Sequence, residues 1–424
     1  MRIAADVPYS YSRCMYSEES MGICKICDHE LKIVVAFGKM PISNRFVTDP
    51  GAEEYVYNLS LGWCPECLMV QLESCVDPAM MFNDEYAYFS SISTAMEDHF
   101  REMAEEISGF ISGRPDPFVI ELGCNDGIML KHIASRGIRH LGIEPSANVA
   151  ATAREKGVQV LGDFFNVRTA SEIRERHGQA DVICGANVMC HIEDINSVFE
   201  GVTVLLKPGG VFFFQDPYLA DIIRKTSFDQ IYDEHVYYFS GVAVSKLGKR
   251  HGLQLVDMVP KDVHGGSMRY YFKKEDNHPV TKDVESLLSQ EKELNLHMLK
   301  GYLSFKENID RICSDLKQML VGIKGEGNRI AAYGATSKST TLLIYSQIGP
   351  DLIDYISDTT PTKIGKYTPG THVPVRSHSH FLQDNPPYTL LLAWNHKREI
   401  LEKEKEYREN GGKFITFFPE VAIE

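Results

Sequence analysis

Long apolar runs are missing from the sequence. None approaches the ~20 residues that a membrane-spanning helix needs, and the N-terminus shows no signal-peptide pattern. Positive charge is also scarce, because 44 Lys and Arg residues face 58 Asp and Glu residues and the formal net charge is −14. This excess of acid argues against a nucleic-acid backbone or an anionic membrane as the main partner. We therefore expect a cytoplasmic protein with no nucleic-acid or membrane partner, in which local cations can still bind a small anion.

Low-complexity segments and short tandem repeats are absent as well. What is present is the composition of a globular protein, with 43% hydrophobic and 24% charged residues. A chain of 424 residues is too long for one ordinary core, so we expect two or three domains. Ten cysteines in a reducing compartment predict metal ligands or buried thiols before disulfides.

Two CxxC pairs near the N-terminus carry the metal prediction. Their members are Cys24, Cys27, Cys64 and Cys67. Each CxxC turn can aim both sulfurs at one ion, and four thiolates form the closed tetrahedral shell that structural zinc prefers. A redox role for either pair is the alternative, but two copies flanking one small segment favour zinc. Cys14 and Cys75 stand alone in the sequence and are not expected to be ligands.

A strand, a glycine turn and a helix are predicted in the stretch DPFVIELGCNDGIML. Gly123 and Gly127 permit tight turning of the backbone, and the helix that follows can present its amides to a ligand. A second strand ends in Glu144, 23 residues after Glu121. This is close to the spacing at which a carboxylate meets the ribose hydroxyls of an adenosine cofactor.

Three more strands follow in the same alternation with helices. The third strand lies in VQVLGDFF and brings Asp163 to its end, where the carboxylate can approach an adenine amine. The fourth strand lies in ADVICGANVMCHI, which also contains Asn187 and His191. The fifth strand lies in LLKPGGVFFFQDP. Alternating strands and helices predict a mostly parallel, doubly wound sheet that binds its ligands at the carboxyl ends of the strands.

The glycine turn also indicates which cofactor is bound. A dinucleotide fingerprint needs a second glycine where this chain has Asn125, and Asp126 would repel a pyrophosphate. With its acidic strand ends, the turn resembles that of S-adenosylmethionine-dependent methyltransferases. NAD binding and a ligand-free Rossmann-like domain are the alternatives. The expected cofactor-binding residues are Glu121, Gly123, Asn125, Gly127, Glu144, Asp163 and Asn187.

The stretch IYDEHVYYFS, residues 231–240, crowds titratable groups beside aromatic rings shortly after the fifth strand. Methyl transfer to carbon needs a base that removes a proton next to a carbonyl and groups that hold the developing negative charge. His235 can serve as base, a neighbouring carboxylate such as Glu234 can fix its tautomer, and Tyr232 can donate to an enolate oxygen. His191 is expected at the same edge of the sheet. Purely structural roles for the histidines, and core roles for the aromatic residues after them, are the alternatives.

The motifs in combination resemble those of the deoxysugar C-methyltransferases of antibiotic and surface-polysaccharide pathways. The motifs that carry this resemblance are the two CxxC pairs, ELGCNDG, YDEHVYYFS, VHGGSMR and AAYGATSKSTTLLIY. The resemblance covers nearly the whole chain from about residue 20. That family methylates C3 of nucleotide-activated 4-keto-6-deoxy sugars, so the resemblance implies S-adenosylmethionine, structural zinc and a thymidine- or guanosine-linked sugar substrate. It makes His235 the base that takes the C3 proton, with Tyr232, Glu234, His191 and Tyr86 as companions, although Tyr88 competes with Tyr86. Inversion at C3 is expected, and the chain is taken as a monomer or homodimer.

Residues 276–325 predict one or two amphipathic helices that link domains, with dimerisation as the alternative role.

A second strand, glycine turn and helix follow in RIAAYGATSKSTTLLIY. This turn supplies Gly334, Thr336, Ser337 and Lys338, which can cradle a diphosphate, although Ser339 stands where the family usually has glycine. Arg269 and Asn395 are further candidates for binding the sugar nucleotide. The alternative for this domain is a purely structural role.

The expected fold is therefore α/β in three parts. They are a small zinc-binding N-terminal lobe over residues 1–83, a central doubly wound Rossmann-like methyltransferase domain over 84–275, and a second Rossmann-like domain over 276–424 that binds the sugar nucleotide. Two rival functions stay open. One is an O- or N-methyltransferase acting on a sugar or another metabolite, and the other is a non-catalytic zinc-bearing scaffold with a vestigial methyltransferase fold.

Overall fold

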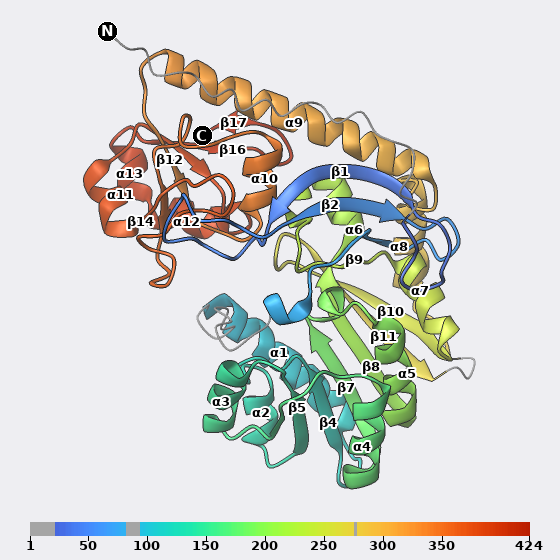
Figure 1. Cartoon of the computed structure of the whole chain (residues 1–424). Helices are drawn as coiled ribbons and strands as arrows, with labels where there is room; N and C mark the ends of the chain where they lie inside the picture. The colour runs from blue at the N-terminus through green and yellow to red at the C-terminus, as the bar shows by residue number, and fades with distance from the viewer. Residues whose placement is uncertain (1–21, 82–93, 275–277) are drawn as a thin grey trace.

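Three β-sheets organise the chain in a computed structural model that describes residues 22–81, 94–274 and 278–424 (Figure 1). The predicted Tyr86, its competitor Tyr88 and Cys14 lie outside these described residues. The N-terminal sheet contains β1 (Lys32–Pro41), β2 (Val56–Trp63) and β3 (Val70–Leu72), which are followed by the short helix η1 (Pro78–Met80). Within the described part of the chain, no helix has both the length and the apolar character to cross a bilayer.

The N-terminal sheet has a fourth strand that comes from the middle of the chain. Its order is β1-β2-β3-β9, where β9 is Tyr237–Tyr238 in the crowded segment 231–240. Val70 pairs with Tyr238 and Gln71 with Tyr237 in antiparallel register, and the Leu72 amide donates to the Val236 carbonyl at 2.8 Å. The segment predicted to carry the chemistry is therefore bonded to the N-terminal sheet along its backbone.

The central sheet has the order β10-β11-β8-β7-β4-β5-β6. Its strands are β4 (Phe118–Leu122), β5 (Arg139–Ile143), β6 (Val160–Leu161), β7 (Ala180–Ala186), β8 (Leu206–Pro217), β10 (Leu253–Lys261) and β11 (Ser267–Lys274). The strands β4 to β8 run parallel, as predicted, and β11 and β10 continue the sheet antiparallel. The chain winds outward in both directions from β4 and β7, so a crevice opens between the carboxyl ends of these two strands.

Helices cover both faces of the central sheet because its strands are apolar on both sides. In β8, Phe212 and Phe214 belong to one core cluster, whereas Val211 and Phe213 belong to the other. The helices are α1 (Thr94–Ile111), α2 (Leu130–Ala134), α3 (Ala147–Glu155), α4 (Val167–His177), α5 (Ile195–Leu205), α6 (Leu219–Lys225) and α7 (Gly241–Arg250). The short helices η3 (Met189–His191) and η4 (Phe228–Gln230) lie in loops after β7 and α6.

The C-terminal sheet repeats the parallel plan in the order β14-β13-β12-β15-β16-β17, with only β17 antiparallel among the described strands. Its strands are β12 (Ile330–Tyr333), β13 (Ile356–Asp358), β14 (Val375–Ser377), β15 (Tyr388–Leu391), β16 (Lys413–Thr416) and β17 (Ala422–Ile423). Its helices are α10 (Ser339–Tyr345), α11 (His378–Asp384), η5 (Trp394–His396), α12 (Lys397–Lys403) and α13 (Lys405–Glu409). The second Rossmann-like sheet is thus present.

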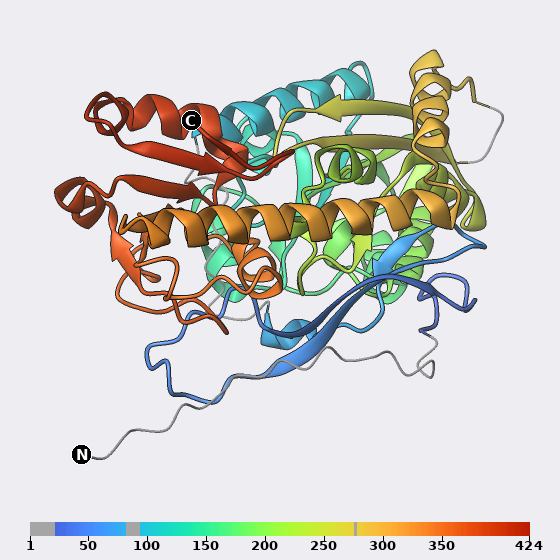
Figure 2. The ribbon, with the colours of Figure 1, turned by 90° about the horizontal axis from the view of Figure 1, so that it is seen from above.

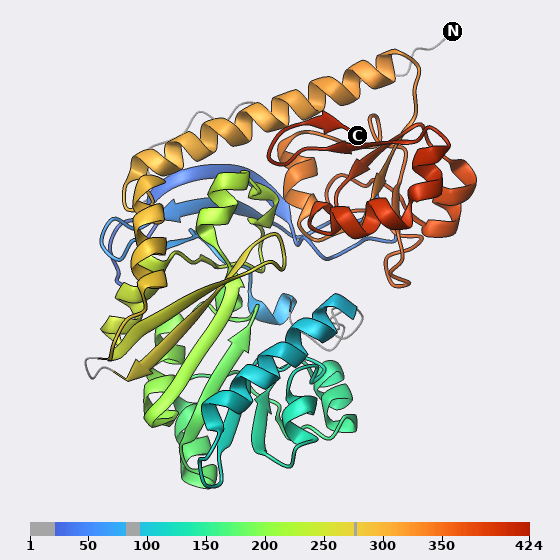
Figure 3. The ribbon, with the colours of Figure 1, turned by 180° about the vertical axis from the view of Figure 1, so that it is seen from behind.

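Two helices link the central and C-terminal sheets, α8 (Lys282–Glu293) and α9 (Leu299–Gly325). Buried apolar residues recur along α9 at helical spacing, among them Tyr302, Phe305, Ile309 and Leu316, so this helix lays one face on the rest of the chain. Figures 1 and 3 show α9 running over β1 and on to the C-terminal sheet, and Figure 2 shows it crossing the molecule from above. The helix braces the parts of one chain against each other.

All three sheets meet beside α10. Thr340 Oγ1 donates to the Ser43 carbonyl of the N-terminal lobe at 3.1 Å, and Thr341 Oγ1 donates to the Ile231 carbonyl at 2.7 Å. Ser43 in turn donates its amide to both carboxylate oxygens of Asp233 at 3.2 Å, and its hydroxyl donates to the same side chain. The segment 231–240 is therefore fixed from the N-terminal and C-terminal sides at once.

Candidate active site and metal centre

The four CxxC cysteines converge in the N-terminal lobe. Their sulfur atoms all lie within 4.8 Å of one another, with Cys24–Cys67 and Cys27–Cys64 each at 3.5 Å. Tetrahedral zinc with Zn–S bonds of about 2.3 Å places its sulfurs about 3.8 Å apart, so the four thiols fit this ion. Gln71 Nε2 donates to Cys24 Sγ at 3.1 Å, which stabilises thiolate charge. Cys75 is not part of the cluster.

The first glycine turn is shaped by close contacts. Gly123 has φ +63°, and a Cβ built there would lie 2.6 Å from Val188 Cγ2. Its amide donates to the Ile143 carbonyl of β5 at 2.8 Å. Gly127 has φ +75°, and a Cβ would come within about 3 Å of Val158 and Ala153. The turn therefore lies in the crevice between β4 and β7, with β5 alongside it.

Two of the predicted acids surround this turn. Glu144 accepts the amide of Asn125 at 3.0 Å and the amide of Ser146 at 2.9 Å. Glu121 is buried, and its Oε2 has no hydrogen-bond partner among the described residues; burial and then Glu144 raise its pKa well above the ordinary value. Carboxylates in this position suit a cofactor with ribose hydroxyls, an ammonium group and a sulfonium charge. The donor set fits S-adenosylmethionine.

Asp126 does not act as the sequence argument supposed. Its side chain is buried and pairs with Lys156 at 3.0 Å, so its charge is balanced within the protein and does not face a ligand in the turn. Asp126 would therefore not repel a pyrophosphate, and it does not distinguish S-adenosylmethionine from NAD as the cofactor.

The remaining predicted cofactor residues lie at the carboxyl edge of the same sheet. Asn187 follows β7 with φ +54°, donates its amide to the Gln215 carbonyl at 2.7 Å, and has a shielded Oδ1 that finds no partner in the described chain. Asp163 follows β6 and is half-exposed, and its carboxylate accepts from Arg168 at 2.9 Å. If the Asp163 carboxylate contacts an adenine amine, it does so while it is also paired with Arg168.

His235 lies buried at this edge, and its surroundings define its protonation. Its Nδ1 lies 3.0 Å from the Gln230 carbonyl oxygen, which can only accept, so the proton is on Nδ1 and Nε2 carries a lone pair. Nε2 lies 3.1 Å from the Tyr232 hydroxyl, which therefore donates to it. Burial first, and then His191 and Lys338, hold the pKa of His235 well below its ordinary value. The ring is neutral at physiological pH.

His191 stacks on His235, with ring centroids 5.2 Å apart and planes at 26°. The two are brought together by the Val236 amide, which donates to the Cys190 carbonyl at 2.7 Å. Burial lowers the pKa of His191 to about 4. The expectation that His191 and the crowded segment share one edge agrees with this geometry.

Glu234 is buried beside His235 in sequence but makes no hydrogen bond with it. Burial first, and then Asp233, raise the pKa of Glu234 to about 8. The tautomer of His235 is set instead by the Gln230 backbone carbonyl, a partner that side-chain patterns cannot reveal. At neutral pH Glu234 is therefore a neutral carboxylic acid and can donate a hydrogen bond.

The C-terminal glycine turn repeats the contacts of the first one. Gly334 has φ +90° and donates its amide to the Ser357 carbonyl at 2.8 Å, as Gly123 does to β5. Asp358 accepts the amides of Ala335 and Thr360, each at 2.7 Å, as Glu144 does from Asn125 and Ser146. The second sheet therefore has the same acid-and-glycine arrangement at its own crevice.

The other residues predicted for the sugar nucleotide have different surroundings. Thr336 and Ser337 lie in the turn itself, where the Ser339 hydroxyl bonds back to the Thr336 carbonyl at 2.5 Å. Lys338 is mostly buried, and in the described chain its ammonium makes no hydrogen bond or ion pair; its Nζ lies 5.9 Å from the Trp394 ring centroid. Asn395 lies in η5, which follows β15 in the chain.

Arg269 is committed elsewhere. Its guanidinium is 1% exposed, pairs with Glu106 of α1 and donates to Gln215 Oε1 at 2.9 Å. Because these protein groups bind both terminal nitrogens of the buried guanidinium, we leave Arg269 out of the phosphate site proposed below.

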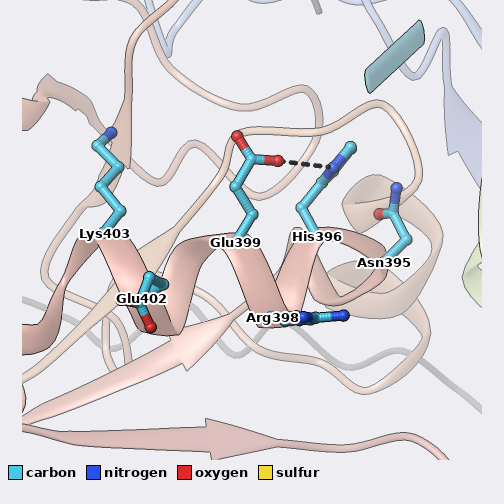
Figure 4. A pocket seen from close by; sticks show the side chains of 6 residues that line it. All are labelled: Asn395, His396, Arg398, Glu399, Glu402 and Lys403. Carbon is cyan, nitrogen blue, oxygen red and sulfur yellow. Dashed lines mark ion pairs between the residues drawn. The ribbon is translucent and has the colours of Figure 1, made fainter. Parts of the chain in front are cut away.

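An open pocket of about 630 Å³ lies beside Asn395. Its lining residues are Asn395, His396, Arg398, Glu399, Glu402 and Lys403. Figure 4 shows the carboxylate of Glu399 directed at the His396 ring, and the Nδ1–Oε2 distance is 3.8 Å. The volume is that of a small-molecule site, at the carboxyl end of the C-terminal sheet.

Sequence reasoning missed Asp216 and His264. Asp216 ends β8 fully buried; burial raises its pKa to about 7, and its neighbours at Met189 and Cys190 make no hydrogen bond of good geometry with it. Cys190 Sγ also lies within 4.8 Å of ring nitrogens of His191 and His235. The QDP end of the fifth strand was the only signal for Asp216, and the histidine of VHGGSMR was the only signal for His264.

Comparison with known proteins gives three family matches. They are a "C-methyltransferase C-terminal domain" over residues 262–419, a "Methyltransferase domain" over 96–258 and a "Putative zinc binding domain" over 24–82. The C-methyltransferase NovU of Streptomyces niveus is 33% identical over 404 residues, which are 94% of this chain and 96% of NovU. A ubiquinone biosynthesis O-methyltransferase of Bordetella avium (strain 197N) is 32% identical over 117 residues, 27% of this chain and 46% of the relative.

Solved structures match the central part. An S-adenosylmethionine-dependent methyltransferase from Clostridium acetobutylicum is 14% identical, covers 42% of this chain and 92% of its own, and has a TM-score of 0.34. The CcbJ methyltransferase from Streptomyces caelestis is 16% identical, with 42% and 90% coverage and a TM-score of 0.33. These scores carry no argument about the substrate.

The central sheet, its glycine turn and the cysteine cluster define an S-adenosylmethionine-dependent methyltransferase that binds zinc. Because the match to NovU extends over almost the whole of both chains and a C-methyltransferase model covers the C-terminal part, this chain belongs to the NovU family of C-methyltransferases.

Proposed function

We propose that the enzyme methylates C3 of a nucleotide-linked 4-keto-6-deoxy sugar through an enolate. The observation that carries this proposal is the state of His235, a neutral imidazole whose unprotonated Nε2 accepts from the Tyr232 hydroxyl at the carboxyl edge of the cofactor-binding sheet. Transfer to carbon next to a ketone requires a base that removes a proton from that carbon, whereas transfer to oxygen or nitrogen removes no carbon-bound proton. S-adenosylmethionine supplies the electrophilic methyl group.

His235 takes the C3 proton on Nε2. The Gln230 carbonyl keeps the other ring nitrogen protonated throughout, so the resulting imidazolium is held by a hydrogen bond that is already formed. The low pKa of the free base is offset during the reaction, because the enolate brings negative charge beside the ring and so favours its protonated form. His191 is stacked on the ring, and burial lowers its own pKa to about 4, so it is neutral at pH 7.

The enolate oxygen at C4 needs hydrogen-bond donors. Glu234 can serve because its pKa of about 8 leaves it protonated at pH 7, and the Tyr232 hydroxyl lies next to His235 and can turn to the substrate. Tyr86 keeps its proposed role as a further tyrosine of the site. Glu234 therefore acts as a neutral donor here and not as a partner that orients the histidine.

The nucleotide is assigned to the C-terminal domain. Asp358 repeats the amide contacts of Glu144, the acid expected to meet a ribose, so we assign the nucleoside's sugar hydroxyls to Asp358. The turn from Gly334 to Lys338 then faces the phosphates. With both glycine turns occupied, one chain holds methyl donor and sugar nucleotide in two crevices.

A direct test incubates the protein with methyl-labelled S-adenosylmethionine and a panel of thymidine- and guanosine-linked 4-keto-6-deoxy sugars. We expect label at C3 of one panel member, located by NMR of the isolated product. Label on a sugar oxygen or an amine would instead establish the rival O- or N-methyltransferase activity. No S-adenosylmethionine binding by calorimetry would favour the scaffold alternative.

The base is tested without the methyl donor. In heavy water the wild type should exchange the C3 proton of its substrate for deuterium, and His235→Gln should lose that exchange. His177→Gln is the matched control, because His177 is exposed and ends α4 just before β7 begins, at the opposite edge of the sheet. Equal exchange in wild type and His235→Gln would remove His235 as the base.

A further inference from the structure

His264 occupies an unusual turn between β10 and β11. Its backbone has φ +54°, in the left-handed region that few residues other than glycine adopt and in which Asn, Asp and His are enriched. The next two residues leave no space: a Cβ on Gly265 would lie 2.4 Å from the Trp394 ring, and one on Gly266 would lie 2.2 Å from Asp221 Oδ2. The turn is therefore held between α6 of the central domain and η5 of the C-terminal domain.

One ring nitrogen of His264, Nε2, makes no hydrogen bond within the described chain. The residue as a whole keeps partial exposure, but its Nε2 is shielded from solvent and has no hydrogen-bond partner among the described residues. A buried polar atom without a partner is destabilising, so its retention points to a group that binds there.

The surroundings of His264 disfavour its charged form. Burial first, and then Lys338 before α10, His396 in η5 and His99 in α1, lower the pKa of His264 to about 3. Lys225 of α6 donates to the Gly265 carbonyl at 2.5 Å, and Asp221 lies against Gly266 with Arg224 as its partner.

Among the described residues, Lys338 has no carboxylate as an ion-pair partner. The acid that acts on its charge is Asp229, and that carboxylate already accepts from Trp394 Nε1 at 2.6 Å. In the described chain, the Lys338 ammonium and the His264 Nε2 thus have no hydrogen-bond or ion-pair partner. The ammonium lies near the Trp394 ring, and the turn that carries His264 packs on the same ring from the other domain. Such a pair fits a group with several negative oxygens.

We propose that His264 and Lys338 together bind the diphosphate of the sugar nucleotide across the boundary between the central and C-terminal domains, and that His264 takes up a proton when it does so. This inference rests on the proposed function. It places the diphosphate near the catalytic centre, because Lys338 stands at the start of α10 and Thr341 of that helix donates to the Ile231 carbonyl at 2.7 Å. A nucleoside at Asp358 and a sugar at His235 need their linking group in this position.

The sign of the proton uptake follows from the charges. In the free protein His264 is neutral at pH 7, because burial and three basic neighbours disfavour its charged form. A diphosphate supplies negative charge next to the ring, which raises its pKa, and the imidazolium then donates a charge-assisted hydrogen bond from Nε2. His396 is the neighbour that could take up the proton instead.

The test is isothermal titration of the full-length zinc-loaded protein with thymidine diphosphate and guanosine diphosphate, each compared with its nucleoside. His264→Asn is the chosen variant, because Asn tolerates positive φ. We expect it to bind the better diphosphate at least about tenfold more weakly, while nucleoside and S-adenosylmethionine affinities stay unchanged. His372→Asn is the control, because His372 also has positive φ (+57°) but pairs with Glu54, away from the cluster.

Proton uptake is measured by repeating the wild-type titration at pH 7 in two buffers of different ionisation enthalpy. We expect uptake with the diphosphate, none with the nucleoside, and its loss in His264→Asn but not in His396→Gln. Absence of uptake in the wild type, or uptake lost only in His396→Gln, would overturn the inference, and so would diphosphate affinity unchanged in His264→Asn. A wild type that binds neither diphosphate would instead contradict the proposed function itself.

Discussion

Glu234 makes the proposed chemistry sensitive to alkaline pH. Its pKa of about 8 means that about 90% of the side chain is protonated at pH 7 and about 10% at pH 9. If the protonated form donates to the enolate oxygen, kcat/KM should fall about tenfold between these pH values. Glu234→Gln keeps an N–H donor at every pH, so we expect a loss of only a few fold at pH 7 and no further decline toward pH 9.

The assay is kcat/KM for label transfer from pH 6 to 9.5, with the same substrate and saturating methyl donor for both proteins. The acid side should stay flat to well below pH 6.5, because burial keeps His235 unprotonated there. Glu326→Gln serves as control, since Glu326 is exposed after α9. An identical alkaline decline in wild type and Glu234→Gln would show that another group titrates and that Glu234 is not the donor.

Three further changes test the framework of the site. Asp233→Ala leaves the buried amide and hydroxyl of Ser43 without their acceptor, so urea denaturation should show a loss of about 2–4 kcal/mol, against about 1 kcal/mol for Ser43→Ala. Cys64→Ser should remove bound zinc in metal analysis and lower both the thermal midpoint and methyl transfer; zinc retained at the wild-type level would contradict the four-thiolate centre. Gly123→Ala should weaken S-adenosylmethionine binding about tenfold or more in calorimetry, and adding Val188→Ala should restore only part, because the contact at 2.6 Å is removed but φ +63° stays strained.

The central and C-terminal sheets were predictable because their signals are local. Apolar strands buried on both faces, each followed by a glycine turn and a helix, can be read along the chain without knowing what they touch. The strand-end acids followed from the same logic, and Glu144 does lie on the glycine turn.

Other features depend on contacts between distant residues and leave no local pattern. The pairing of Tyr238 with Val70 joins residues far apart in the chain, and a two-residue strand has too little periodicity to be recognised. The acceptor for His235 is a backbone carbonyl, which every residue possesses. The sequence indicated that Asp126 faces a ligand, because its partner Lys156 is 30 residues away and no local pattern reveals the pair.

The position of β9 has a consequence for any attempt to divide the protein. A fragment limited to the central methyltransferase part would retain Tyr237 and Tyr238 but lose the partner strand that uses their backbone amides and carbonyls. It would expose an unpaired aromatic edge directly beside the base, and such edges recruit other chains. We expect the isolated fragment to self-associate and to be inactive, so the metal-bearing lobe and the catalytic segment have to be kept together when the enzyme is divided or recombined with a relative.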